Sequence, residues 1–214
     1  MGCIDEVDRH FHDLPFMNVE QAAKLKRFLK RHRLTSCLEL GFLHGKSSAF
    51  IASVLRDMGE GHLTTIDLKH SMEREPNIHQ VLGKLELEYW VTPIYEPRSY
   101  NRRMMRMLEE RERPSFDFCY IDAAHTWYDT GFGFFLVDKL LRPGGWILFD
   151  DMHFTYEKLL KPGAKKPGYL ARMTPEERET KQVRKVWKLL VKEHPNYDEF
   201  IEEGTWGFAR KRPN

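Results

Sequence analysis

The chain has 214 residues, of which 41% are hydrophobic and 31% are charged, and its formal net charge at pH 7 is +2. This composition argues against a disordered chain, and the apolar runs are far shorter than the ~20 residues that cross a bilayer. The near balance of charge argues against a dedicated nucleic-acid binder. Three cysteines without a CxxC pair, and a start without an apolar signal segment, predict a reduced, cytoplasmic setting.

Strand and helix patterns alternate along most of the chain. The first helix is expected over residues 19–33, because Asn18 and Gln21 have the spacing of a capping box ahead of an amphipathic pattern. Further elements then follow in alternation, with strands at 37–40, 62–67, 90–95, 116–121 and 146–149 and helices at 46–58, 78–87, 100–111 and 132–141. This alternation predicts an α/β fold with right-handed βαβ units and a mainly parallel sheet covered by helices on both faces.

The C-terminal part departs from this alternation. Residues 155–173 are rich in Lys, Gly and Pro and are predicted to form a long loop, which is a candidate lid. The lysines of this loop, expected to face solvent, are Lys158, Lys161, Lys165 and Lys166. Thr174 and Glu177 mark the start of a helix. That single helix is expected to bury Val183, Val186, Trp187 and Leu190. Residues 197–201 and 205–209 are predicted to form a closing hairpin.

Aromatic side chains are frequent after the fourth predicted strand. The pattern assigns to the core Trp127, Tyr128, Phe132, Phe134 and Phe135. An alternative role for Trp127 or Tyr156 is to shape a pocket for a second substrate.

The turn after the first strand is the first candidate ligand site, because open α/β sheets bind ligands at the carboxyl ends of their strands. Gly41 allows a sharp bend, and Gly45 is expected to let a ligand approach the helix that follows. The third glycine of a dinucleotide-binding GxGxxG motif is missing. Glu39 would attract an ammonium group, and Asp67 ends the second strand, where an acid commonly binds ribose hydroxyls. The pattern favours a ligand with a ribose and a positive charge, although Glu39 and Gly41 could also be purely structural.

Three acids form the second candidate site. Asp122 ends the fourth strand, and Asp150 and Asp151 end the fifth, which should be its neighbour in the sheet. Two like charges ~4 Å apart cost ~4 kcal/mol at an effective dielectric constant of ~20, so a proton or a cation is expected among them. Oxygen ligands favour Mg²⁺, with Ca²⁺ or Mn²⁺ as alternatives. His125 is a candidate general base beside this site. The structural alternative is that the acids cap a loop and a helix and that His125 is a loop histidine.

These motifs together resemble the class I S-adenosylmethionine-dependent methyltransferases over about residues 35–210. The motifs that carry the resemblance are Glu39-Leu40-Gly41-Phe42-Leu43-His44-Gly45, Asp67 and Pro143-Gly144-Gly145-Trp146. The resemblance implies a Rossmann-like, mainly parallel seven-stranded sheet with a C-terminal antiparallel hairpin. It divides the chain into an N-terminal helical segment, 1–34, and a methyltransferase domain, 35–214. The cofactor-binding residues that it implies are Glu39, Gly41, Gly45, Ser47, Asp67, Ser99 and Asp122.

The acids are similar to those of the metal-dependent small-molecule O-methyltransferases, of the catechol type and of the macrolide-sugar and aminocoumarin type. This likeness implies Mg²⁺, or another divalent cation, at Asp122, Asp150 and Asp151. It also implies His125 as general base and a small hydroxylated molecule as methyl acceptor, with neither nucleic acid nor membrane as partner. The alternatives are an N- or nucleic-acid methyltransferase, a non-catalytic nucleoside-binding protein of the same fold, and a nicotinamide dehydrogenase. The sequence leaves open whether the chain forms a homodimer.

Overall fold

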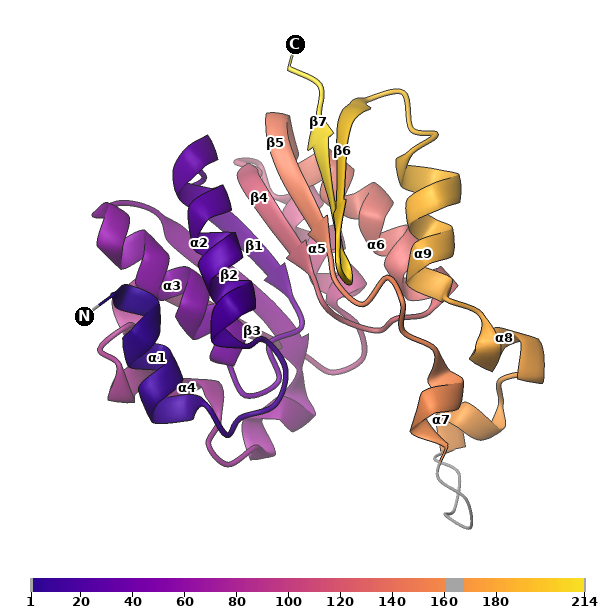
Figure 1. The fold of residues 1–214 in the computed structure, drawn as a ribbon. Helices are drawn as coiled ribbons and strands as arrows, with labels where there is room; N and C mark the ends of the chain where they lie inside the picture. The colour runs from indigo at the N-terminus through magenta and orange to yellow at the C-terminus, as the bar shows by residue number, and fades with distance from the viewer. Residues whose placement is uncertain (1, 161–167, 214) are drawn as a thin grey trace.

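A seven-stranded sheet forms the centre of the computed structural model, which describes residues 2–160 and 168–213 (Figure 1). The strands lie in the order β3-β2-β1-β4-β5-β7-β6. Strands β1 to β5 pair in parallel, whereas β7 runs antiparallel to both β5 and β6. The bounds are β1 Ser36–Leu40, β2 His62–Leu68, β3 Val91–Glu96, β4 Phe116–Ile121, β5 Leu141–Phe149, β6 Tyr197–Glu203 and β7 Trp206–Lys211. The predicted α/β fold, with its closing antiparallel hairpin, is confirmed.

The side chains of the strands divide the core into two clusters, one on each face of the sheet, because successive residues of a strand point to opposite faces. On β4, Phe118 and Tyr120 belong to one cluster, and Cys119 and Ile121 belong to the other. Helices α1 to α4 cover the first cluster, and α5, α6 and α9 cover the second (Figure 1). These helices are α1 Cys3–Phe11, α2 Val19–His32, α3 Lys46–Met58, α4 Ile78–Lys84, α5 Tyr100–Glu109, α6 Trp127–Leu140 and α9 Gln182–Val186. Shorter helical turns are η1 Lys69–Glu73, η2 Glu88–Trp90, η3 Tyr156–Leu159, α7 Gly168–Ala171, α8 Pro175–Glu179 and η4 Trp187–Val191.

Two helices precede the first strand, where the sequence pattern predicted one. The predicted capping box of α2 is confirmed, since Asn18 accepts a hydrogen bond from the Gln21 N–H at 2.9 Å and the Gln21 side chain accepts one from the Asn18 N–H at 3.0 Å. Helix α1 was not expected, and it buries Ile4 and Val7 in the same core cluster as α3. The boundary after residue 34 between an N-terminal helical segment and the methyltransferase domain stays a prediction.

The expectation of a single C-terminal helix was wrong. Its predicted start is confirmed by a capping box at the beginning of α8, but α8 ends after one turn, and α9 then passes into a π-helical turn, η4. Gln182 holds the break, because its amide Nε2 donates to the Glu177 carbonyl at 2.8 Å and its Oε1 accepts the Trp127 N–H at 2.6 Å. The Gln182 side chain thereby satisfies the Glu177 carbonyl, which in a continuous helix would accept a backbone N–H.

The assignment of every α6 aromatic to the core was also wrong. Phe134 is fully buried, whereas Tyr128, Phe132 and Phe135 are exposed. The exposed three recur at helical spacing, so they share the side of α6 that faces away from the sheet.

The predicted loop at 155–173 contains η3 and α7, and part of it, including Lys161, Lys165 and Lys166, lies outside the described residues. A lid role for this loop stays a prediction. Within the described ranges, every helix is too short or too polar to span a bilayer.

Candidate active site

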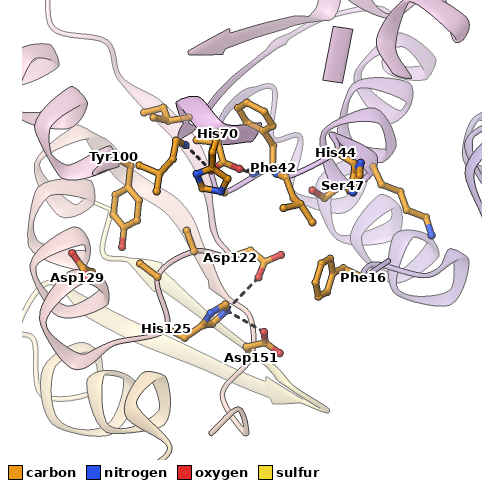
Figure 2. Close-up of a pocket in the computed structure, with 18 of the residues that line it drawn as sticks. Phe16, Phe42, His44, Ser47, His70, Tyr100, Asp122, His125, Asp129 and Asp151 are labelled. Atoms are coloured by element: carbon orange, nitrogen blue, oxygen red, sulfur yellow. Dashed lines mark hydrogen bonds and ion pairs between the residues drawn. The ribbon is translucent and has the colours of Figure 1, made fainter. Parts of the chain in front are cut away.

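A cavity of about 460 Å³ opens at the carboxyl ends of β1, β2, β4 and β5 (Figure 2). Its volume lies within the ~300–1,000 Å³ typical of pockets for small molecules and cofactors. The wall includes the turn between β1 and α3, the start of α5 and the loop between β4 and α6. The connection between α1 and α2 adds a further wall. The predicted position of the ligand site at the strand ends therefore coincides with the cavity.

Both glycines of the first turn have left-handed backbone angles, with φ of 92° at Gly41 and 90° at Gly45. A Cβ on Gly41 would lie 2.3 Å from the carbonyl oxygen of Asp122, and a Cβ on Gly45 would lie 2.5 Å from Cγ1 of Ile78. Gly41 lines the cavity, whereas the close approach that Gly45 permits is to Ile78 of α4. The need for glycine is thus explained at both positions by contacts within the protein.

Glu39 lies in the buried part of β1 and has no exposed surface. Its Oε2 accepts hydrogen bonds from the Ser48 hydroxyl and, at 2.7 Å, from Oγ1 of Thr65. Its Oε1 is buried without a hydrogen-bond partner among the described residues. Burial raises the pKa of Glu39 to about 7, against the lowering effect of the hydroxyl groups of Ser47, Ser48 and Thr65. Glu39 does not line the cavity.

Asp67 lines the cavity at the end of β2 and organises the first turn. Its Oδ2 accepts the backbone N–H groups of Phe42 at 2.9 Å and Leu43 at 2.7 Å, and Oδ1 accepts the N–H of Leu68 at 2.6 Å. A carboxylate has about four acceptor sites, so Asp67 retains capacity for a ligand hydroxyl. Ser47 and Ser99 also line the cavity.

Asp122, His125 and Asp151 form the acid–histidine cluster at one wall of the cavity (Figure 2). The His125 Nε2 lies 3.0 Å from Oδ2 of Asp151 and 3.6 Å from Oδ1 of Asp122. One ligand atom from each of the three residues lies within 4.8 Å of the others, a spacing that could accommodate a metal ion. Burial lowers the pKa of His125, but the two carboxylates outweigh that effect and raise it to about 9. A left-handed backbone at Asp151, with φ of 56°, accompanies the turn of its side chain toward His125.

Asp150 is held on the protein side of this cluster and does not line the cavity. Its Oδ2 accepts the Tyr120 hydroxyl at 2.6 Å, and its Oδ1 accepts Oγ1 of Thr205 at 3.0 Å and the Asp151 N–H at 2.6 Å. The same Tyr120 oxygen lies 3.3 Å from Oδ2 of Asp122. Burial and the charge of Asp122 raise the pKa of Asp150 to about 6. The three predicted acids are therefore neighbours, but Asp122 and Asp151 face the cavity together, without Asp150.

Sequence reasoning missed Tyr120, Lys46 and Phe16. Tyr120 had one usable signal, because a tyrosine in an otherwise apolar strand needs a partner for its hydroxyl and shares a strand face with Asp122, two residues on. Lys46 and Phe16 gave no local signal, since both enter the site through contacts between separate parts of the chain.

The fold and the site are those of the Rossmann-like methyltransferases. The features that define this class are the strand order, the closing hairpin and the cavity beside Asp67 at the carboxyl ends of the strands. A family model described as a methyltransferase domain matches residues 38–152, which is more than half of the chain. The chain belongs to this methyltransferase domain family.

The chain is similar in sequence to known O-methyltransferases. "Probable caffeoyl-CoA O-methyltransferase 3" of Dictyostelium discoideum is 27% identical over 139 residues, which cover 65% of this chain and 52% of the relative. The chain thus spans about half the length of the curated relatives that it matches.

Two solved structures extend the likeness over nearly the whole chain. An O-methyltransferase from Bacillus cereus in complex with SAH has a TM-score of 0.68 and 17% identity, covering 98% of this chain and 90% of that one. MycE methyltransferase from the mycinamycin biosynthetic pathway, in complex with Mg, SAH and mycinamycin VI, has a TM-score of 0.63 and 16% identity, covering 98% of this chain and 54% of that one. At these identities, the likeness shows the shared fold.

Proposed function

We propose that this protein transfers a methyl group from S-adenosylmethionine to a hydroxyl group of a small molecule, assisted by a divalent cation and by His125. The observation that carries the proposal is the acid–histidine cluster on the wall of a cofactor-sized cavity. The relative and the two structural neighbours described above are named as O-methyltransferases or methyltransferases, and both neighbours contain SAH.

The cavity suits S-adenosylmethionine, which supplies an activated methyl group on a sulfonium sulfur. Asp67 would accept hydrogen bonds from the ribose, and the Gly41 backbone and Ser47 would hold the methionine part. Ser99, at the start of α5, would contact the adenine. Glu39, whose Oε1 has no hydrogen-bond partner among the described residues, would offer an acceptor for the ammonium group.

Asp122 and Asp151 would hold the divalent cation, beside His125, the third group of the cluster. The two carboxylates make Mg²⁺ the first choice. When bound, such an ion lowers the pKa of an acceptor hydroxyl and favours its attack on the methyl group. Asp150 would support this pair from behind, through the Tyr120 hydroxyl and the Asp151 N–H.

His125 would take the proton of the acceptor hydroxyl, which requires the neutral imidazole. In this structure, Asp122 and Asp151 raise its pKa to about 9, which favours the protonated ring. A divalent cation held by the same two carboxylates would offset their effect on the imidazole and favour its neutral form. His125 would move the proton, and the cavity walls would orient the acceptor oxygen toward the methyl group.

Isothermal titration calorimetry with S-adenosylmethionine tests the first step. Binding is expected, whereas no heat with this cofactor together with tight binding of NAD would overturn the proposal. Release of S-adenosylhomocysteine is then measured with a panel of hydroxylated acceptors, including 3,4-dihydroxybenzoate, with Mg²⁺ or with excess chelator.

Asp122→Ala and Asp151→Ala are expected to abolish the metal-stimulated turnover. Asp198→Ala is a matched control, because Asp198 lies on β6 and its ion pair with Arg212 is at the surface. Unchanged turnover in excess chelator would remove the cation from the proposal but leave methyl transfer standing.

A further inference from the structure

The connection between α1 and α2, residues 12–17, lies against the cavity, and we name it the strap. It contributes Pro15, Phe16 and Met17 to the cavity wall. Its C-terminal end is fixed, because Met17 is buried in the core and Asn18 caps α2. The strap is far in sequence from the acid–histidine cluster, yet it borders the same cavity.

The N-terminal end of the strap is fixed by Lys46, the first residue of α3. The Lys46 side chain is 5% exposed, and its Nζ donates to the carbonyl oxygens of Leu14 at 2.8 Å and His12 at 3.3 Å. His12 is also the C-cap of α1, where the carbonyl end of a helix favours a cation. Within the described residues, no carboxylate forms an ion pair with Lys46 at 4.0 Å or less. Its hydrogen bonds therefore go to the backbone of the strap, while the charges of Asp8 and Asp13 favour its cationic form.

Phe16 stands between these two fixed ends in a conformation that folding alone does not explain. Its φ is 70°, a left-handed value that is unfavourable for an L-residue with a large side chain. Phe16 is 72% exposed, so the burial of its side chain offsets little of the free energy that this backbone conformation costs. Phe16 lines the same cavity as Asp122 and Asp151, and in the view of Figure 2 its ring lies on the opposite side of Asp122 from Tyr100. A strained and exposed aromatic residue on a cavity wall points to a ligand contact.

We propose that Lys46 is a positioning residue that clamps the strap against the cavity, and that Phe16 is thereby held as the wall of the acceptor site next to the acid–histidine cluster. This inference rests on the proposed methyl transfer and adds to it the element that bounds the acceptor. Lys46 directly precedes Ser47, so the helix start proposed to hold the methionine part of the cofactor also holds the strap. The clamp therefore sets the distance between the cofactor end and the acceptor end of the cavity.

A merely structural Lys46 would stabilise α3 and α1 as a whole, whereas a clamp acts on the strap. Hydrogen–deuterium exchange separates the two roles, because it reports opening segment by segment. We compare the wild-type protein, Lys46→Met, which removes the donors, and Lys46→Arg, which retains a cation with several donors. Lys188→Met is the control, because Lys188 is an exposed lysine of η4.

In Lys46→Met, exchange of the strap amides is expected to accelerate at least about tenfold, with α3 and α2 protected as in the wild type. Lys46→Arg should restore most of the protection, and Lys188→Met should behave as wild type. Affinity for S-adenosylmethionine should change less than about threefold in Lys46→Met. Equal exchange of the strap in the wild type and Lys46→Met overturns the clamp, and so does exchange that rises equally throughout α3.

Phe16→Ala tests the wall without disturbing the core, since the side chain is exposed. With 3,4-dihydroxybenzoate as probe, the KM for this acceptor should rise about three- to tenfold in Phe16→Ala and in Lys46→Met, while the KM for the cofactor is unchanged. An unchanged acceptor KM in Phe16→Ala overturns the assignment of Phe16. If the wild type binds no S-adenosylmethionine, the proposed function fails, while the exchange experiment still decides the clamp.

Discussion

Replacing Glu39 with glutamine should remove a large part of the pH dependence of this protein's stability. The carboxyl group is fully buried, one of its oxygens has no partner among the described residues, and its pKa rises from 4.5 to about 7. The folded state therefore holds the Glu39 proton more tightly than the unfolded state does. This contribution to stability is complete below the unfolded pKa of 4.5 and is lost as the pH rises through about 7.

The size of the effect follows from the difference between the two pKa values, at ~1.4 kcal/mol for each pKa unit. The free energy of unfolding of the wild type should fall by about 3 kcal/mol through Glu39 as the pH increases from about 5 to about 8.5. The amide of a glutamine would mimic the protonated carboxyl group, so Glu39→Gln should match the wild type at low pH and exceed its stability at high pH.

Urea unfolding followed by circular dichroism across this pH range measures the effect. Asp150 and His125 also have raised pKa values, so the quantity to examine is the difference between wild type and Glu39→Gln at each pH. That difference should grow from near zero to about 3 kcal/mol in favour of the variant. A difference that stays constant with pH, or that grows in favour of the wild type, would refute the reasoning that Glu39 is protonated in the folded protein below neutral pH.

Four further substitutions test separate parts of the site. Asp151→Asn should weaken the affinity for Mn²⁺, measured by calorimetry, more than Asp150→Asn does. For Asp150→Asn the expected loss of affinity is about 10- to 100-fold, as is typical of a group that supports a metal ligand. A larger loss in Asp150→Asn would make Asp150 the ligand. His125→Ala should lower kcat by ~10²–10⁴ in a variant that still folds cooperatively, and a nearly normal rate would assign the proton transfer to another group. Gly45→Ala should lower the free energy of unfolding in urea by about 1–3 kcal/mol, because the new methyl group meets Ile78; no loss would show that α4 moves away easily.

Much of the fold was predictable because its signals are local. The alternating strands and helices, the capping box at Asn18 and the helix start at Thr174 depend on residues within one or two turns of each other. The single C-terminal helix was wrong because Gln182 forms hydrogen bonds to two different segments, which no periodic pattern reveals. Tyr128, Phe132 and Phe135 of α6 were misassigned because hydrophobicity does not say which side of a helix meets a sheet.

The candidate site shows the same division. The chemical groups at the carboxyl ends of the strands could be predicted from local patterns, since strand ends can be recognised from apolar runs and the turns that follow them. Which of these groups face the cavity depends on how the chain folds. The left-handed backbone of Asp151 accompanies its turn toward His125, while Tyr120 and Thr205, distant along the chain, hold Asp150 behind it. The direction of a side chain after a strand depends on backbone angles and on partners from other elements, and those partners come together only when the chain is folded.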